Sequence, residues 1–205
     1  MGLFLLTVAG ISLSGVMMPG PVFAATVARG WKSRFAGPFI AIGHAIVEVP
    51  IMLLIYFGFY SFFQNQSVKI FLGLVGGIVL IYMGRGIFNL KRNNTTMIKD
   101  INPSSTATAA GAITSLFNPY FILWWATVGA ALIMKSVVFG ILGFALFGIV
   151  HWLCDLVWYS VVSYGVHHSK RVWGEKIQLI LYGISSGMLF GFGIWFIISS
   201  FKWMV

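Results

Sequence analysis

The sequence predicts an all-α integral membrane protein with six transmembrane helices. Of its 205 residues, 59% are hydrophobic and only 8% are charged, whereas a soluble domain carries about 25% charged residues. Because lipid cannot satisfy backbone polar groups, only helices and closed barrels span a bilayer. The apolar runs, such as 70–82 and 141–150, lack the alternation of barrel strands. Helices are therefore expected.

Six apolar segments are each long enough for a membrane helix, which needs about 20 residues. In chain order, they are Leu3–Ala28, Pro38–Phe63, Val68–Leu90, Thr108–Met134, Val137–Val166 and Ile177–Met204. The polar stretch 93–106 is expected to be a cytoplasmic linker, because its Asn, Pro, Ser and Thr residues are typical of loops. The linker would divide the chain into units 1–92 and 107–205, each with three helices.

The basic residues predict the orientation, because cytoplasmic loops of membrane proteins are enriched in Lys and Arg. The net charge is +9, and ten of the 13 basic residues fall in or beside the first, third and fifth connections. These are Arg29, Lys32, Arg34, Arg85, Lys91, Arg92, Lys99, Lys170, Arg171 and Lys176. We expect a multi-pass protein of the cell membrane with both termini outside. The charge then serves topology and lipid headgroups, not nucleic-acid binding.

The two units share an order of features that favours a duplicated, inverted repeat. Three helices per unit give the second unit the opposite orientation. The first unit has Pro19-Gly20-Pro21 in its first helix and the pair His44 and Glu48 in its second; the second unit has Asn118-Pro119 and the pair His151 and Asp155. Each unit thus has a proline-broken helix followed by a helix with His and a carboxylate four residues apart.

The proline motifs are candidate substrate-binding positions. Prolines remove backbone donors and clash with the preceding turn, so helices one and four are expected to break there. Broken membrane helices often place their ends at substrate sites, where helix N-termini attract anions. The candidates are Pro19, Gly20, Pro21, Asn118 and Pro119. The alternatives are a packing kink at the first break and simple capping by Asn118.

Glu48 and Asp155 are the acidic residues that lie deep in apolar spans, where a carboxylate usually marks a pathway or a proton relay. His44 shares a helix face with Glu48, and His151 with Asp155, because residues four apart are neighbours. Three interpretations remain open. The four side chains move protons, they bind a divalent cation, or each His merely satisfies a nearby carbonyl.

The remaining features favour packing over chemistry. No hydrolase, phosphate-loop or zinc-protease motif is present, so we expect no enzyme and no cofactor. The single cysteine, Cys154, excludes a paired-thiol relay. Glycines spaced along the later helices allow close helix packing and also a homodimer. Trp124 and Trp125, which follow the second break, are candidates to line a cavity.

Three segments resemble the LysE/RhtB family of amino-acid exporters. They are Ser14–Pro21, which ends in Pro-Gly-Pro; Leu80–Arg85; and Gly111–Trp125, around Asn118-Pro119. The resemblance covers the whole chain and implies six spans, with the two breaks at a central site. It also implies export of amino acids or similar small zwitterions driven by the proton gradient. The chain departs from the family at Tyr120, where Lys is common, and at His44 and Glu48.

The hypothesis from the sequence is therefore a proton-coupled secondary transporter, an antiporter that exports amino acids or related small zwitterions by alternating access. Its partners would be a small-molecule substrate, protons and the lipid bilayer. Glu48 and Asp155 would carry protons, and His44 and His151 would tune them. The alternative is an exporter of divalent transition-metal cations that uses the same four side chains as ligands.

Overall fold

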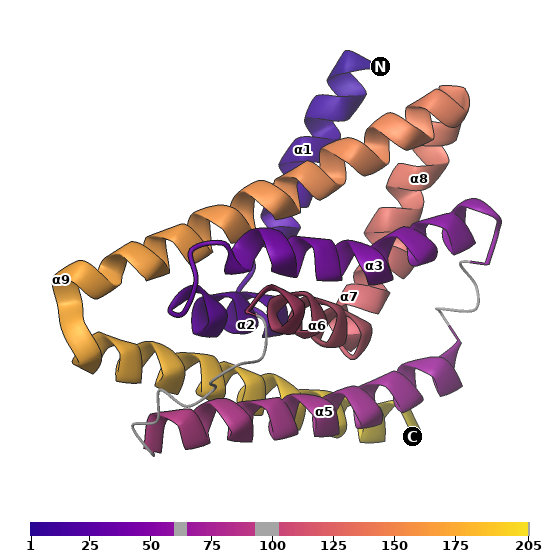
Figure 1. Cartoon of the computed structure of the whole chain (residues 1–205). Coiled ribbons are helices and arrows are strands. Elements are labelled where there is room, and N and C mark those ends of the chain that lie inside the picture. The colour runs from indigo at the N-terminus through magenta and orange to yellow at the C-terminus, as the bar shows by residue number, and fades with distance from the viewer. Residues whose placement is uncertain (60–64, 93–102, 205) are drawn as a thin grey trace.

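The computed structural model describes residues 1–59, 65–92 and 103–204, and within these ranges it contains helices and turns but no strand (Figure 1). Five segments are long and apolar enough to cross a membrane, and there are six when α1 and α2 are counted as one bent span. The predicted helical membrane architecture is thus confirmed. The predicted linker falls mostly at 93–102, outside the described residues.

The chain bends sharply between its first two helices. Helix α1 spans Gly2–Val16 and α2 spans Pro21–Gly30, and their axes are bent by 74°. Gly20 is extended (φ −151°, ψ −173°), and Pro21 begins α2. Proline suits this position, because its fixed φ matches a helix and the first N–H of a helix lacks an intrahelical partner. The segment between the helices therefore interrupts the span.

A second interruption follows α6, which spans Pro103–Leu116. Helix α7, Pro119–Trp124, begins with a proline, and the Asn118 side chain accepts a hydrogen bond from the Tyr120 N–H (3.1 Å). The π-helical turn η1, Trp125–Gly129, and helix α8, Ala130–Val137, continue the chain. Single π-helical turns inside helices are frequent at functional sites. This one begins at Trp125, the second of two adjacent tryptophans.

Helix α9 spans Gly140–Met204, where the sequence predicted two helices joined by a basic loop. Figure 1 shows that α9 instead reverses its direction at a bend while the backbone stays helical. The stretch 167–176 contains one glycine and no proline, so nothing in its composition forces a helix to end. His167 and His168 therefore lie on a helix and not in a loop.

The two long central helices begin close to their predicted starts. Helix α3 spans Ala36–Tyr56 and α5 spans Gln66–Arg92. Helix α5 packs along the second half of α9, where Leu80, Leu189 and Phe196 are buried together (Figure 1). Helix α3 lies between α6 and the first half of α9.

Glycines let α3 approach both neighbours closely. A Cβ at Gly43 would overlap the Thr108 carbonyl of α6, and a Cβ at Gly111 would overlap the Ile40 carbonyl of α3. On the other side, a Cβ at Gly37 would overlap the Tyr159 carbonyl of α9. Because these obstacles are backbone atoms, no side-chain rotation can relieve them. The three glycines thus fix the spacing of the helices that carry the polar residues described below.

We predict that Gly111→Ala destabilises the protein by about 1–3 kcal/mol, the usual cost of overpacking, because its methyl group must push α3 away from α6. Thermal unfolding of the purified protein in nanodiscs measures the effect. Gly165→Ala is the matched control, since nothing lies within 4 Å of a Cβ built there. Equal stability of the two variants would contradict the proposed close crossing.

Candidate functional site

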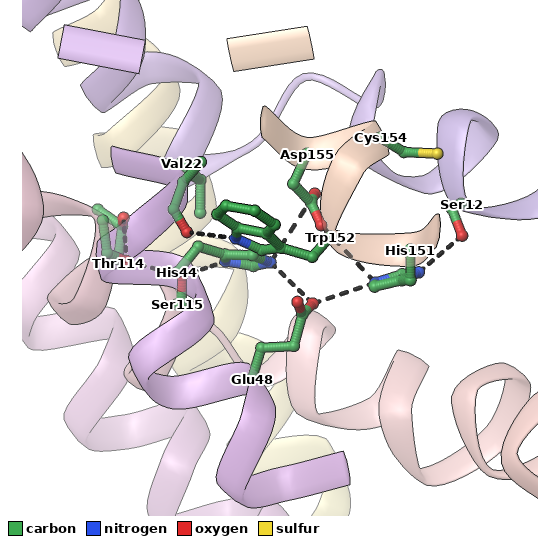
Figure 2. A network of polar contacts seen from close by, with 12 residues as sticks. Ser12, Val22, His44, Glu48, Thr114, Ser115, His151, Trp152, Cys154 and Asp155 are labelled. Atoms are coloured by element: carbon green, nitrogen blue, oxygen red, sulfur yellow. Dashed lines mark hydrogen bonds and ion pairs between the residues drawn. The ribbon is translucent and has the colours of Figure 1, made fainter. Parts of the chain in front are cut away.

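Four ionisable side chains from α3 and α9 converge inside the helix bundle, and we call them the tetrad: His44, Glu48, His151 and Asp155 (Figure 2). The Glu48 Oε1 atom lies 3.1 Å from His151 Nε2 and 3.2 Å from His44 Nε2. Asp155 is farther away, with its oxygens 3.9 Å from His44 Nε2 and 3.8 Å from His151 Nε2. Each histidine thus faces both carboxylates, and Glu48 bridges the two rings.

A serine holds the outer nitrogen of each histidine ring. Ser115 Oγ of α6 lies 2.6 Å from His44 Nδ1, and Ser12 Oγ of α1 lies 2.6 Å from His151 Nδ1 (Figure 2). Each serine comes from a helix that ends at one of the two interruptions, and its histidine comes from the other unit of the chain. The tetrad is therefore anchored to both interrupted segments.

The hydrogen bonds of Ser115 assign the proton on the His44 ring. The Ser115 hydroxyl donates to the Gly111 carbonyl (2.7 Å), and a hydroxyl has only one proton to donate. It must therefore accept from His44 Nδ1–H. A neutral His44 then has a bare Nε2 facing Glu48 Oε1, which is also an acceptor. The contact between these two atoms needs one further proton, on the ring or on the carboxyl group.

His151 has no such requirement. If the Ser12 hydroxyl donates to Nδ1, a neutral His151 carries its proton on Nε2 and donates it to Glu48 Oε1. The two histidines are thus inequivalent although their positions correspond. The contact that needs an extra proton is therefore the one between His44 and Glu48.

The tetrad is buried, and two of its oxygens have no hydrogen-bond partner. Glu48 is fully buried, and the exposed fractions of Asp155, His44 and His151 are 3%, 5% and 6%. Glu48 Oε2 and Asp155 Oδ2 accept no hydrogen bond. A buried anion without partners is costly, and these two oxygens are the acceptors of the tetrad that remain unsatisfied.

A cavity of about 180 Å³ lies against the tetrad and reaches both interruptions. Of the candidate residues, Pro19, Gly20, Pro21 and Asn118 line it together with all four members of the tetrad. Pro119 begins α7 beside the cavity-lining Asn118 and Tyr120. Trp124 and Trp125 line the cavity as well, and their rings contact the His151 ring at centroid distances of 5.3 and 5.0 Å. The structure thus brings the candidate positions from both units around one space.

The sequence did not reveal several residues that complete this site. Ser12 and Ser115 stand in apolar or small-residue stretches, and their histidine partners are 139 and 71 residues away. The second half of α9 contributes Phe192, Trp195 and Phe196 to the cavity wall. Aromatic residues are common in membrane helices, so no local signal separated these three from lipid-facing ones.

Long apolar helices around a cavity that buried ionisable side chains line define a polytopic membrane protein. The family model described as LysE type translocator matches residues 13–200. The chain therefore belongs to the LysE family. It is 30% identical over 193 residues to the Bacillus subtilis (strain 168) protein named "Putative amino acid efflux protein YcgF", covering 92% of this chain and 91% of that protein. No solved structure matches the chain.

We predict that His44 carries its proton on Nδ1 in the folded protein and that Ser115→Ala abolishes this preference. The ¹⁵N resonances of histidine-labelled protein in nanodiscs distinguish protonated from bare ring nitrogens, and His44→Gln identifies the signals. Ser136→Ala is the control, because Ser136 is a buried serine whose hydroxyl donates only to the Ile133 carbonyl of its own helix. A bare Nδ1 in the unmodified protein would overturn the assignment.

Proposed function

We propose that this protein is a proton-coupled secondary transporter that exports amino acids or related small zwitterions from the cell. Membership of the LysE family and the efflux named for the Bacillus subtilis relative support export. The observation that carries the proposal is the tetrad, because buried ionisable groups beside a cavity are typical of proton-driven carriers. The more general conclusion that the protein is a membrane transport protein follows from its membership of the LysE family.

Alternating access is the proposed transport cycle. Units 1–92 and 107–205 act as inverted repeats that rock against each other around the cavity. The two interruptions support this scheme, because non-helical backbone at membrane depth is tolerated only where protein or a cavity covers it. The pairs Ser12–His151 and Ser115–His44 support it too, since each joins one unit to the other.

Proton coupling takes place at the tetrad in this proposal. The proton between His44 and Glu48 leaves when a cationic group of the substrate reaches the two unpartnered carboxylate oxygens, and it returns when the substrate departs. The two events exclude each other because both neutralise the same buried anions. Such exclusion makes the protein an antiporter.

The substrate carboxylate is proposed to lie at the N-terminus of α2. Pro19, Gly20 and Pro21 line this edge of the cavity, and Asn118 lines the corresponding edge at the start of α7, where Pro119 is the first helical residue. The first-turn N–H groups of a helix lack intrahelical partners and carry the positive end of its dipole. A zwitterion can then contact α2 with its carboxylate and the tetrad with its ammonium group.

Export of a divalent metal ion is the second candidate. His44, Glu48 and Asp155 each offer a ligand atom, and these atoms lie within 4.8 Å of one another. Histidine and carboxylate ligands suit zinc and manganese. The metal ion would be the cargo, and the same four side chains would carry it.

We further propose a location in the cell membrane with both termini outside, and the small residues of the later helices also permit a homodimer. In Figure 1, the turn between α2 and α3, the bend of α9 and the C-terminal end of α5 lie on the left side of the bundle, and both termini lie in its right half. The sequence places ten of the 13 basic residues in or near these left-hand segments. This distribution supports a cytoplasmic left side.

We predict that proteoliposomes containing the protein take up labelled amino acids only under an imposed pH gradient. Glu48→Gln combined with Asp155→Asn should reduce the flux to that of protein-free vesicles, because it removes both buried carboxylates. Glu175→Gln is the control, a carboxyl-to-amide change outside the predicted apolar spans. Flux of Mn²⁺, Zn²⁺ or Ni²⁺ without amino-acid flux would replace the main proposal by the second candidate.

We predict that alkaline phosphatase fused after Val205 is active in a bacterial host, because this enzyme folds only outside the cytoplasm, whereas a green fluorescent protein at the same place is dark. The reverse pair of results would place the C-terminus inside and contradict the orientation derived from the basic residues. Fusions at the polar stretch 93–102 should give the opposite pattern and serve as the internal control.

A further inference from the structure

Glu48 and Asp155 form an acidic floor of the cavity, and the basic side chains that contact this floor are the two histidines of the tetrad. Glu48 Oε2 and Asp155 Oδ2 are buried without hydrogen-bond partners. Among the described residues, no Lys or Arg lines the cavity. The histidines face the other Glu48 oxygen at hydrogen-bond distance, while Asp155 receives only contacts of 3.8–3.9 Å. The floor therefore favours a ligand group with several N–H donors and a positive charge, which describes a primary ammonium.

The walls of the cavity are aromatic and come from two parts of the chain. Trp124, Trp125 and Phe121 lie on the α7–η1 side, and Phe192, Trp195 and Phe196 lie on the second half of α9. Such walls pack against the apolar part of a ligand. They offer no charged partner to a second ionic group on a ligand.

The volume of the cavity suits an apolar group of moderate size. A cavity of about 150 Å³ lined by apolar side chains is known to bind benzene, and this one measures about 180 Å³. It has room for an aromatic ring or a branched aliphatic chain.

We propose that the cavity binds a primary ammonium carried by a bulky apolar group, so that the exported substrates are apolar or aromatic amino acids recognised chiefly by their ammonium end. This inference rests on the proposed function and specifies its substrate. Acidic amino acids are rejected because a second carboxylate meets Glu48 and Asp155. Lysine and arginine are rejected because their distal charge must be desolvated against the aromatic wall.

The first experiment separates the two ends of the ligand. Two sets of ligands are compared, and each set contains an amino acid, the amine without its carboxylate and the acid without its ammonium group. The branched set is leucine, 3-methylbutylamine and 4-methylpentanoate. The aromatic set is phenylalanine, 2-phenylethylamine and 3-phenylpropanoate. Each is titrated into the purified protein in nanodiscs, with calorimetry and tryptophan fluorescence as readouts, and each is tested as a competitor of labelled-leucine flux. The amino acids and amines should bind at least about tenfold more tightly than the deaminated acids, because the acids leave the buried carboxylates unpaired.

The second experiment tests the size limit with a variant of the wall. Gly15 lines the cavity, and a Cβ there would lie 3.5 Å from Trp124 Nε1, an ordinary contact distance. Gly15→Val should therefore reduce the free space beside Trp124 and weaken binding of phenylalanine roughly tenfold or more relative to alanine. Gly10→Val is the matched control on the same helix, since nothing lies within 4 Å of its Cβ, and it should keep the preference of the unmodified protein.

The outcomes distinguish this inference from the proposed function. Amine binding without transport of any amino acid supports the inference and overturns export. Transport in which deaminated acids compete as well as amines, or in which glutamate or lysine is preferred, overturns the inference and leaves export standing. Absence of both binding and transport overturns both. An unchanged preference in Gly15→Val also counts against the inference, because the cavity would then not set the size of the ligand.

Discussion

The carboxylate of Glu48 is buried at the centre of an apolar helix bundle, where an ionisable group costs at least about 2.5 kcal/mol to place. Its Oε1 atom is satisfied by two histidine rings, one from its own helix and one from α9. This contact requires α3 and α9 to lie close together, and Gly37 permits that approach. Gly43 and Gly111 bring α6 equally close on the other side, so that Ser115 reaches His44. The pairing of the charged groups therefore depends on the close helix packing at these glycines, because neither histidine keeps its partners if the helices separate.

The interruptions of the chain follow from the same constraint on polar groups in lipid. A helix that stops at membrane depth exposes N–H and C=O groups, and these are tolerated only beside protein or a cavity. Both interruptions border the cavity that the tetrad borders, and Asn118 caps the second one with its own side chain. The first turns of α2 and α7, the unpartnered carboxylate oxygens and the aromatic rings therefore surround one space. In the proposed function, a zwitterion with an apolar side chain offers a complementary group to each of them.

The sequence predicted the helical membrane fold, the family and the identity of the buried ionisable residues, because each depends on local composition or on short motifs. Glu48 and Asp155 were conspicuous since charges are rare in apolar spans. Ser12 and Ser115 were not predicted, because a serine in a membrane helix usually bonds to its own backbone and its long-range partner is set by packing. The bend within α9 was expected as a loop, since basic residues indicate a cytoplasmic connection but do not specify its backbone. The volume and the wall of the cavity could not be predicted from the sequence either, because they depend on which face each helix turns inward.

The arrangement of the serines links the protonation of the tetrad to the positions of the interrupted helices. Ser12 lies near the end of α1 and bonds to a histidine of α9, whereas Ser115 lies at the end of α6 and bonds to a histidine of α3. A movement of either interrupted helix must carry its histidine along or break the bond. If the Ser115 bond breaks, His44 Nδ1 loses its acceptor, and the reason for the ring to present a bare Nε2 to Glu48 disappears. In the proposed transport cycle, proton affinity at the centre of the bundle and the position of α6 are therefore energetically coupled, and coupling of this kind must act equally in both directions.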